Sequence, residues 1–151
     1  MIVQRNANYS VSDYIRGGVD DSGEEFSALA VHAKAAALYD RAVYIGSQYR
    51  ADAPDAAARV AALDALIQRT HGALSALRSH RSPDDARALL VARTLLCTAS
   101  IQLQAPLAGV QLAAYQRSVC AAVAASRALE IIDVNQYPHL DPVMAVSLLA
   151  V

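Results

Sequence analysis

Apolar residues recur at intervals of three and four along most of the chain, the spacing typical of amphipathic α-helices. We predict a first helix from about Ser22 to Tyr49, opening on a capping box in which Ser22 caps the helix and Glu25 reaches back. Residues 1–21 carry Gly17-Gly18 and Asp20-Asp21, which break the pattern, so we expect an irregular lead-in there. The expected buried stripe of the first helix comprises Phe26, Leu29, Ala33, Ala36, Ala37, Tyr39, Ala42 and Val43.

Proline and polar residues then mark the start of two more helices. A second helix is predicted after Pro54, ending near Leu77, with Asp64 away from its apolar face; because it is amphipathic, we expect it on the outside of a bundle. A third is predicted to open on Ser82 as the cap, with Pro83 in its first turn, and to end at Gln104 before Pro106. It is apolar nearly all round, which indicates a central position. The apolar face of the second helix comprises Val60, Leu63, Leu66, Ile67, Thr70, Leu74 and Leu77.

The rest of the chain predicts two further helices and no strand. An alanine-rich helix spans about Val110 to Asp133, and Asp141-Pro142 opens a fifth, which continues to Val151 without a C-terminal cap. The predicted fold is all-α, an irregular bundle of about five helices that is part of a larger helical domain. We therefore expect residues 22–151 to form a helical domain that is truncated at its C-terminus.

The composition favours closely packed helices without a basic surface field. Hydrophobic residues make up 55% of the chain, with one Phe and no Trp, so the core must rest mainly on Ala, Leu, Val and Ile. The net charge of −1 gives no general attraction to nucleic acid. Four arginines lie near the second linker, residues 79–85, and form either a solvated face or a surface for an acidic partner: Arg78, Arg81, Arg87 and Arg93.

Cysteine usage and hydropathy indicate the compartment. Cys97 and Cys120 lie in apolar helical runs, so we expect two buried free thiols, which fits a reducing environment. No uninterrupted apolar run reaches the roughly 20 residues of a bilayer span, and the N-terminus does not resemble a secretion signal. These observations predict a nuclear or cytoplasmic protein with no membrane association.

No catalytic, cofactor or metal site is expected. The histidines His32, His71, His80 and His139 lack the i, i+4 spacing of a helical zinc site. Acidic pairs such as Asp84-Asp85 lie at helix starts, where they interact with the helix dipole. No phosphate-binding glycine loop occurs. We predict that the chain is not an enzyme. The weakest alternative is a helical enzyme whose active site has no recognisable sequence motif.

Tyrosines are the best candidates for a pocket or an interface, because each combines apolar area with one polar group. Packing at the core and its rim is the simpler interpretation of the same residues. The candidates are Tyr39, Tyr44, Tyr49, Tyr115 and Tyr137.

Four segments, in order, resemble the middle homology region of fungal zinc-binuclear-cluster transcription factors, particularly the basidiomycete members. Residues 29–35 resemble an L-x-x-H-A-K-A helix, and residues 93–107 resemble a helix ending in I-x-L-H-x-P-F. Residues 120–132 resemble the following alanine-rich helix, and residues 134–144 resemble a segment containing L-D-P-I-M. Gln104 and Leu107 depart from the usual His and Phe. The six-cysteine cluster and basic region that bind DNA in this family are not in the sequence.

The resemblance implies a regulatory role without direct nucleic acid binding. Its expected partners are other parts of a transcription factor or other proteins, and the apolar last helix predicts self-association. A small-molecule-binding bundle, with a pocket between the tyrosine-bearing first helix and the third, is the alternative, together with a protein-interaction scaffold. No cofactor is implied.

Overall fold

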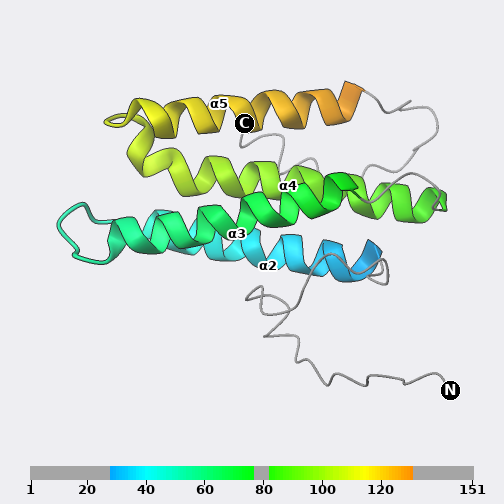
Figure 1. Cartoon of the computed structure of the whole chain (residues 1–151), viewed down its shortest axis with the longest axis horizontal. Helices are drawn as coiled ribbons and strands as arrows, with labels where there is room; N and C mark the ends of the chain where they lie inside the picture. The colour runs from blue at the N-terminus through cyan, green and yellow to red at the C-terminus, as the bar shows by residue number, and fades with distance from the viewer. Residues whose placement is uncertain (1–27, 77–81, 131–151) are drawn as a thin grey trace, which may run out of the picture.

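The computed structural model describes residues 28–76 and 82–130, and all of the regular structure in these residues is helical. The described residues form four helices: α2 (Ala28–Ser47), α3 (Ala56–Ala76), α4 (Pro83–Ala108) and α5 (Leu112–Glu130). They lie side by side along the long axis of the molecule, and successive helices run in opposite directions (Figure 1). The predicted all-α fold class is confirmed for this part of the chain, whereas the predicted irregular bundle of about five helices is confirmed only in part, because these residues form four antiparallel helices and the fifth lies outside them.

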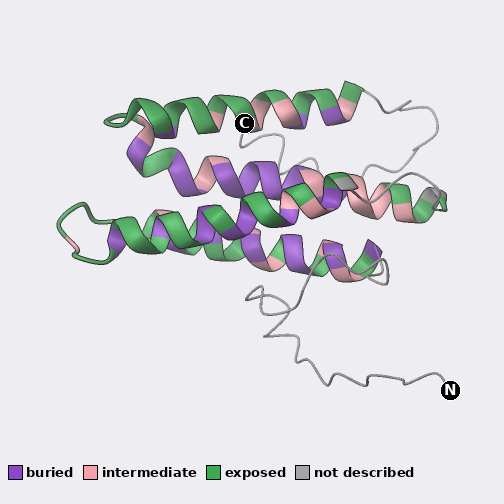
Figure 2. Ribbon diagram, in the orientation of Figure 1, coloured by how far each residue is buried: buried purple, intermediate pink, exposed green. Residues whose placement is uncertain are grey.

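Helix α4 is the central element, as its sequence predicts. It packs against α2, α3 and α5, whereas α5 packs its backbone closely against α4 alone. The segment Val91–Ser100 is buried at every position except Arg93, and it forms the largest buried stretch in Figure 2. Ala92 and Ala99 are fully buried, and their small side chains let neighbouring helices approach closely. By length and composition α4 could also cross a bilayer, but it is the core helix of the bundle, and core helices meet the same criterion.

The start of α4 follows the predicted capping chemistry, but its end does not. The backbone N–H of Asp85 donates to Ser82 Oγ at 3.2 Å, and Pro83 occupies the first turn. The prediction that the helix ends at Gln104 is wrong, because it continues through Pro106 to Ala108. A proline removes one intrahelical hydrogen bond, here the bond to the carbonyl of Gln102. The helix tolerates this loss one turn before its end, where α2 packs against it.

The buried face of α2 differs from the predicted stripe. Leu29 is 73% exposed and Val43 is 38% exposed, although both were assigned to the core. Alanine makes α2 apolar on most of its circumference, so the periodicity alone does not select one face. Lys34, the chain's one lysine, is buried in this face. The residues that α2 does bury are Ala28, Val31, Lys34, Ala35, Leu38, Ala42 and Ile45.

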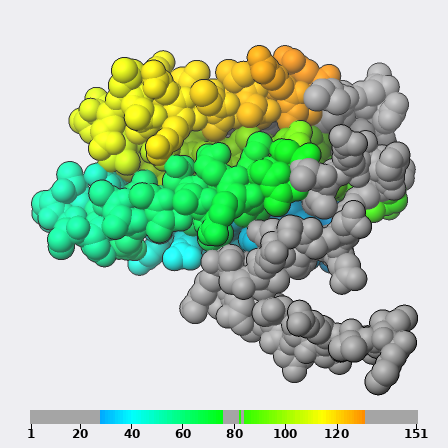
Figure 3. Space-filling model, in the orientation of Figure 1, coloured from blue at the N-terminus to red at the C-terminus, as the bar shows by residue number. Residues whose placement is uncertain are grey.

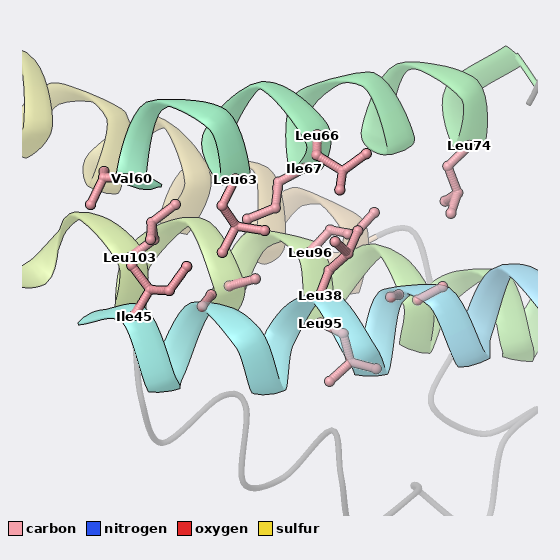
Figure 4. Close-up of a cluster of buried hydrophobic side chains, with 14 of the residues drawn as sticks. Leu38, Ile45, Val60, Leu63, Leu66, Ile67, Leu74, Leu95, Leu96 and Leu103 are labelled. Carbon is pink, nitrogen blue, oxygen red and sulfur yellow. The ribbon is translucent and has the colours of Figure 1, made fainter. Parts of the chain in front are cut away.

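The predicted face of α3 is confirmed for its six described residues, Val60 to Leu74, and their side chains complete the core. The side chains of Leu63 and Ile67 point from α3 toward α2 and α4, where Leu38, Leu96 and Leu103 meet them (Figure 4). Thr70 lies on the same buried face and donates its hydroxyl to the Leu66 carbonyl at 2.9 Å, so its burial leaves no unpaired polar group.

Several predicted features lie outside the described residues. They are the lead-in at 1–21, the capping box of Ser22 and Glu25, the core residues Phe26 and Leu77, the arginines Arg78 and Arg81, the predicted end of the fourth helix at Asp133, the resembling segment 134–144, and the fifth helix from Asp141 onward.

Candidate functional site

A groove of about 560 Å³ lies between α3 and α5, with α4 as its floor. It exists because α3 and α5 both pack on α4 but not closely on each other. In Figure 3, α5 lies above α3, and little of α4 is visible between them. We call this the α3–α5 groove. It is lined by Asp64, Ile67, Gln68, His71, Leu96, Cys97, Ser100, Ala113, Gln116, Arg117, Cys120, Ala121 and Ala124.

Alanines on α5 keep the α3–α5 groove open. Ala113, Ala121 and Ala124 line its α5 wall, where larger side chains would fill the space. The floor is formed by the apolar side chain of Leu96 and by Cys97 and Ser100 of α4. The groove is therefore mostly apolar, with polar groups at its walls, which is the general character of small-molecule sites.

A polar network built on Asp64 closes one end of the α3–α5 groove. Gln104 Nε2 donates to Asp64 Oδ1 at 3.3 Å, and Arg117 Nη1 donates to Asp64 Oδ2 at 3.1 Å. Sequence analysis placed Asp64 on the polar side of α3, whereas the structure buries it. Burial is tolerated because both carboxylate oxygens have a partner. The position of Asp64 between Leu63 and Leu66 was the one available sign of this burial.

His71 and Cys97 meet on the wall of the groove. Cys97 Sγ lies 3.9 Å from His71 Nε2. Burial raises the pKa of the Cys97 thiol above its ordinary value, and nearby Arg93 only partly opposes this. Burial, assisted by the charge of Arg93, lowers the pKa of His71. The thiol is therefore held protonated and the imidazole neutral, the opposite of the thiolate–imidazolium pair that makes a cysteine nucleophilic.

The two cysteines differ in exposure, which corrects the prediction that both are buried. Cys97 is buried, but Cys120 is exposed. Cys120 lies on the side of α5 that faces the α3–α5 groove, and no neighbouring helix covers that side. Among the described residues, no group of three or more His, Cys, Asp or Glu side chains could hold a metal ion.

The candidate tyrosines are dispersed rather than gathered in one pocket. Tyr39 and Tyr49 pack at the edge of the hydrophobic core. Tyr44 is 60% exposed and lines a second groove, between α2 and α3, and Tyr115 is 55% exposed on α5. No tyrosine lines the α3–α5 groove, and Tyr137 lies outside the described residues.

The outward face of α5 carries a row of exposed apolar side chains that sequence analysis did not single out. Leu112, Tyr115, Val119 and Val123 recur at three- and four-residue spacing and are each more than 40% exposed. Ala114, Ala125 and Ala128, on the opposite face of the helix, are buried against the bundle. We call the exposed row the α5 stripe. The sequence does carry a sign of it, because two separate sets of apolar residues, the stripe and the buried alanines, each recur at helical spacing on opposite faces of α5.

The chain was compared with family models, with curated proteins and with solved structures, and no match was found in any of the three. The resemblance to the transcription factor region therefore rests on its sequence motifs alone.

Proposed function

We propose that this chain is a non-catalytic regulatory domain of the kind found in the middle homology region of fungal transcription factors. It acts in the nucleus or cytoplasm, through contacts between helix faces and other parts of a transcription factor or partner proteins. It does not itself bind DNA.

The α5 stripe is the observation that supports this proposal. A helix on the edge of a bundle normally exposes polar residues on its outward face. Here Leu112 is 71% exposed, and Tyr115, Val119 and Val123 continue the row along the helix. Contiguous exposed apolar surface of this kind marks a site of protein contact. The occupant we expect is an apolar helix, because the spacing of the stripe matches ridge-into-groove packing between helices.

A reporter experiment tests the regulatory role. The full chain is fused between an unrelated DNA-binding domain and an activation segment, and reporter transcription is compared with a fusion containing a flexible linker of equal length. We expect the chain to lower transcription. The double substitution Val119→Gln and Val123→Gln should restore it, because polar side chains oppose burial of the stripe.

Val43→Gln is the matched control for the reporter experiment. Val43 is 38% exposed, close to Val119 at 42% and Val123 at 44%, but it lies on α2. An equal loss of effect in both variants, or no effect of the wild-type chain, would contradict the proposal. Salt-sensitive binding of the isolated chain to duplex DNA in a shift assay would contradict it as well.

The α3–α5 groove favours one alternative function, the binding of a small molecule. Its mostly apolar lining fits a ligand with an apolar body, and Gln68, Gln116 and Arg117 at its walls offer hydrogen bonds to a polar end. A thermal-shift screen of metabolites tests this alternative. A true ligand should also slow the labelling of Cys120 by a thiol reagent, since this exposed thiol lines the groove. Stabilisation without protection of Cys120 would place the ligand elsewhere.

A further inference from the structure

The groove between α2 and α3 combines three arginines with an apolar floor. Its volume is about 620 Å³, and Arg41, Arg59 and Arg69 line it together with Tyr44. Ile45, Leu63 and Leu66 form the floor. We call it the arginine groove. None of these arginines belongs to the cluster that sequence analysis noted near the second linker, because they are separated along the chain and the packing of α2 against α3 brings them together.

The arginine groove is lined by three cationic side chains and, among the described residues, by no acidic one. In the part of the chain that the structure describes, no ion pair joins Arg41, Arg59 or Arg69 to a carboxylate. The chain as a whole has a net charge of −1, so the cluster is not a by-product of a generally basic protein. The arginine groove therefore presents three positive charges beside an apolar floor, which favours an anionic partner with apolar side chains.

We propose that the arginine groove binds an acidic, amphipathic helical peptide segment of a partner protein. This extends the interaction role proposed above to a second surface and names the chemistry of the partner. The apolar floor receives the partner's aliphatic side chains, and the guanidinium groups pair with carboxylates along both edges of its helix.

The spacing of the arginines favours a peptide over a small anion. Arg59 and Arg69 are ten residues apart on α3, which corresponds to about 15 Å along the helix axis. Carboxylates on successive turns of a helix can pair with both arginines in extended conformations, whereas a single phosphate or carboxylate would require both side chains to converge on one point. Nucleic acid also carries charges at such spacing, but it has no aliphatic side chains to bury against the floor formed by Ile45, Leu63 and Leu66.

A binding titration tests the proposal. The probe is a fluorescein-labelled peptide of about three helical turns, with leucines on one face and glutamates along both edges of that face. Binding to the full chain is followed by fluorescence anisotropy. We expect saturable binding that weakens as salt is added. The same peptide with every Glu replaced by Gln should not bind, because it keeps the apolar face but loses the charge.

Variants of the chain locate the binding site. Arg41→Gln, Arg59→Gln and Arg69→Gln should each weaken peptide binding by about threefold, as expected for the loss of one exposed ion pair. Arg127→Gln is the matched control, because Arg127 is also exposed but lies in the last turn of α5. It should leave binding unchanged. Thermal melting of each variant shows whether the fold is kept, and none is expected to melt differently because all four side chains are exposed.

Each of several results would overturn the proposal. They are equal binding of the Glu and Gln peptides, equal weakening by Arg127→Gln and Arg59→Gln, no binding at low salt, or displacement of the peptide by a lower concentration of duplex DNA. The reporter effect of the α5 stripe is measured without this peptide. Either proposal can therefore fail while the other stands.

Discussion

Substitution of Gly46 by alanine should destabilise the bundle, although alanine is the better helix former. Gly46 lies in the last turn of α2, against α4. A Cβ atom built at this position would lie 2.6 Å from the carbonyl oxygen of Gln102 and 3.5 Å from its carbonyl carbon. Both atoms belong to the backbone of α4, so no side-chain rotation can relieve the contact. The two helices would have to separate.

The cost can be worked from two opposing effects. Overpacking of a well-packed contact costs about 1–3 kcal/mol, and a rigid backbone neighbour places Gly46→Ala at the upper end. Replacing a helical glycine by alanine stabilises the helix by about 1 kcal/mol. The net loss in the free energy of unfolding is about 2 kcal/mol, which for a chain of this size lowers Tm by about 4–8 °C.

Gly72→Ala is the matched control. Gly72 is also helical, in α3, but an added Cβ there meets no atom within 4 Å. It should gain the helix-forming benefit alone, about 1 kcal/mol, and raise Tm by about 2–4 °C. Urea and thermal unfolding followed by circular dichroism measure both variants. Equal stabilisation by the two substitutions would refute the close approach of α2 and α4 at Gly46.

Three further predictions concern the α3–α5 groove. Asp64→Ala should destabilise the chain by about 1–3 kcal/mol, because the buried Gln104 amide loses its acceptor. Arg117→Ala should cost less than about 1 kcal/mol, because the Arg117 side chain is 55% exposed in its ion pair with Asp64. A larger loss of stability in Arg117→Ala than in Asp64→Ala, measured by urea unfolding, would contradict the proposed polar network. Because burial lowers the pKa of His71, the unfolded chain takes up this proton first as the pH falls below the ordinary histidine value, and stability should decrease there. In His71→Gln, the free energy of unfolding measured by urea titration should fall less steeply between about pH 7 and pH 5 than in the wild-type chain. The same pH dependence in both chains would show that His71 is not the source of the loss. A thiol reagent should label one cysteine quickly in the folded chain and the second only on unfolding, with Cys120→Ser removing the fast phase; two fast thiols would contradict the burial of Cys97.

The sequence predicted the start of a helix well where a polar capping residue and a proline mark it. Ser82 and Pro83 placed the start of α4 correctly, because the cap is a local interaction that needs no tertiary contact. The buried face of α3 was also found, since large aliphatic residues alternate there with charged ones. On α2 the same method failed. Alanine contributes little to the contrast between faces, so the choice of Val31 and Leu38 over Leu29 and Val43 is made by packing on α4.

Pro106 shows how a local signal can be overridden by packing. Proline was expected to end the third helix, yet α4 continues past it. The Gln102 carbonyl, which lacks the hydrogen bond that residue 106 would normally donate, is the same group that comes closest to Gly46 of α2. Pro106 of α4 and Gly46 of α2 therefore both act on one group, the carbonyl of Gln102. No reading of either helix alone could have paired them.

The two grooves could not be predicted for a related reason. The residues that line the α3–α5 groove come from three helices, and the hollow depends on α3 and α5 both packing on α4 without closing on each other. The arginine groove likewise needs α2 and α3 in register before Arg41 and Arg59 share one surface. Capping and periodicity determine where helices begin and which residues they can bury. The surfaces left for recognition follow from the spacing between helices, which is set by small residues such as Ala92, Ala99 and Gly46 on the faces that meet.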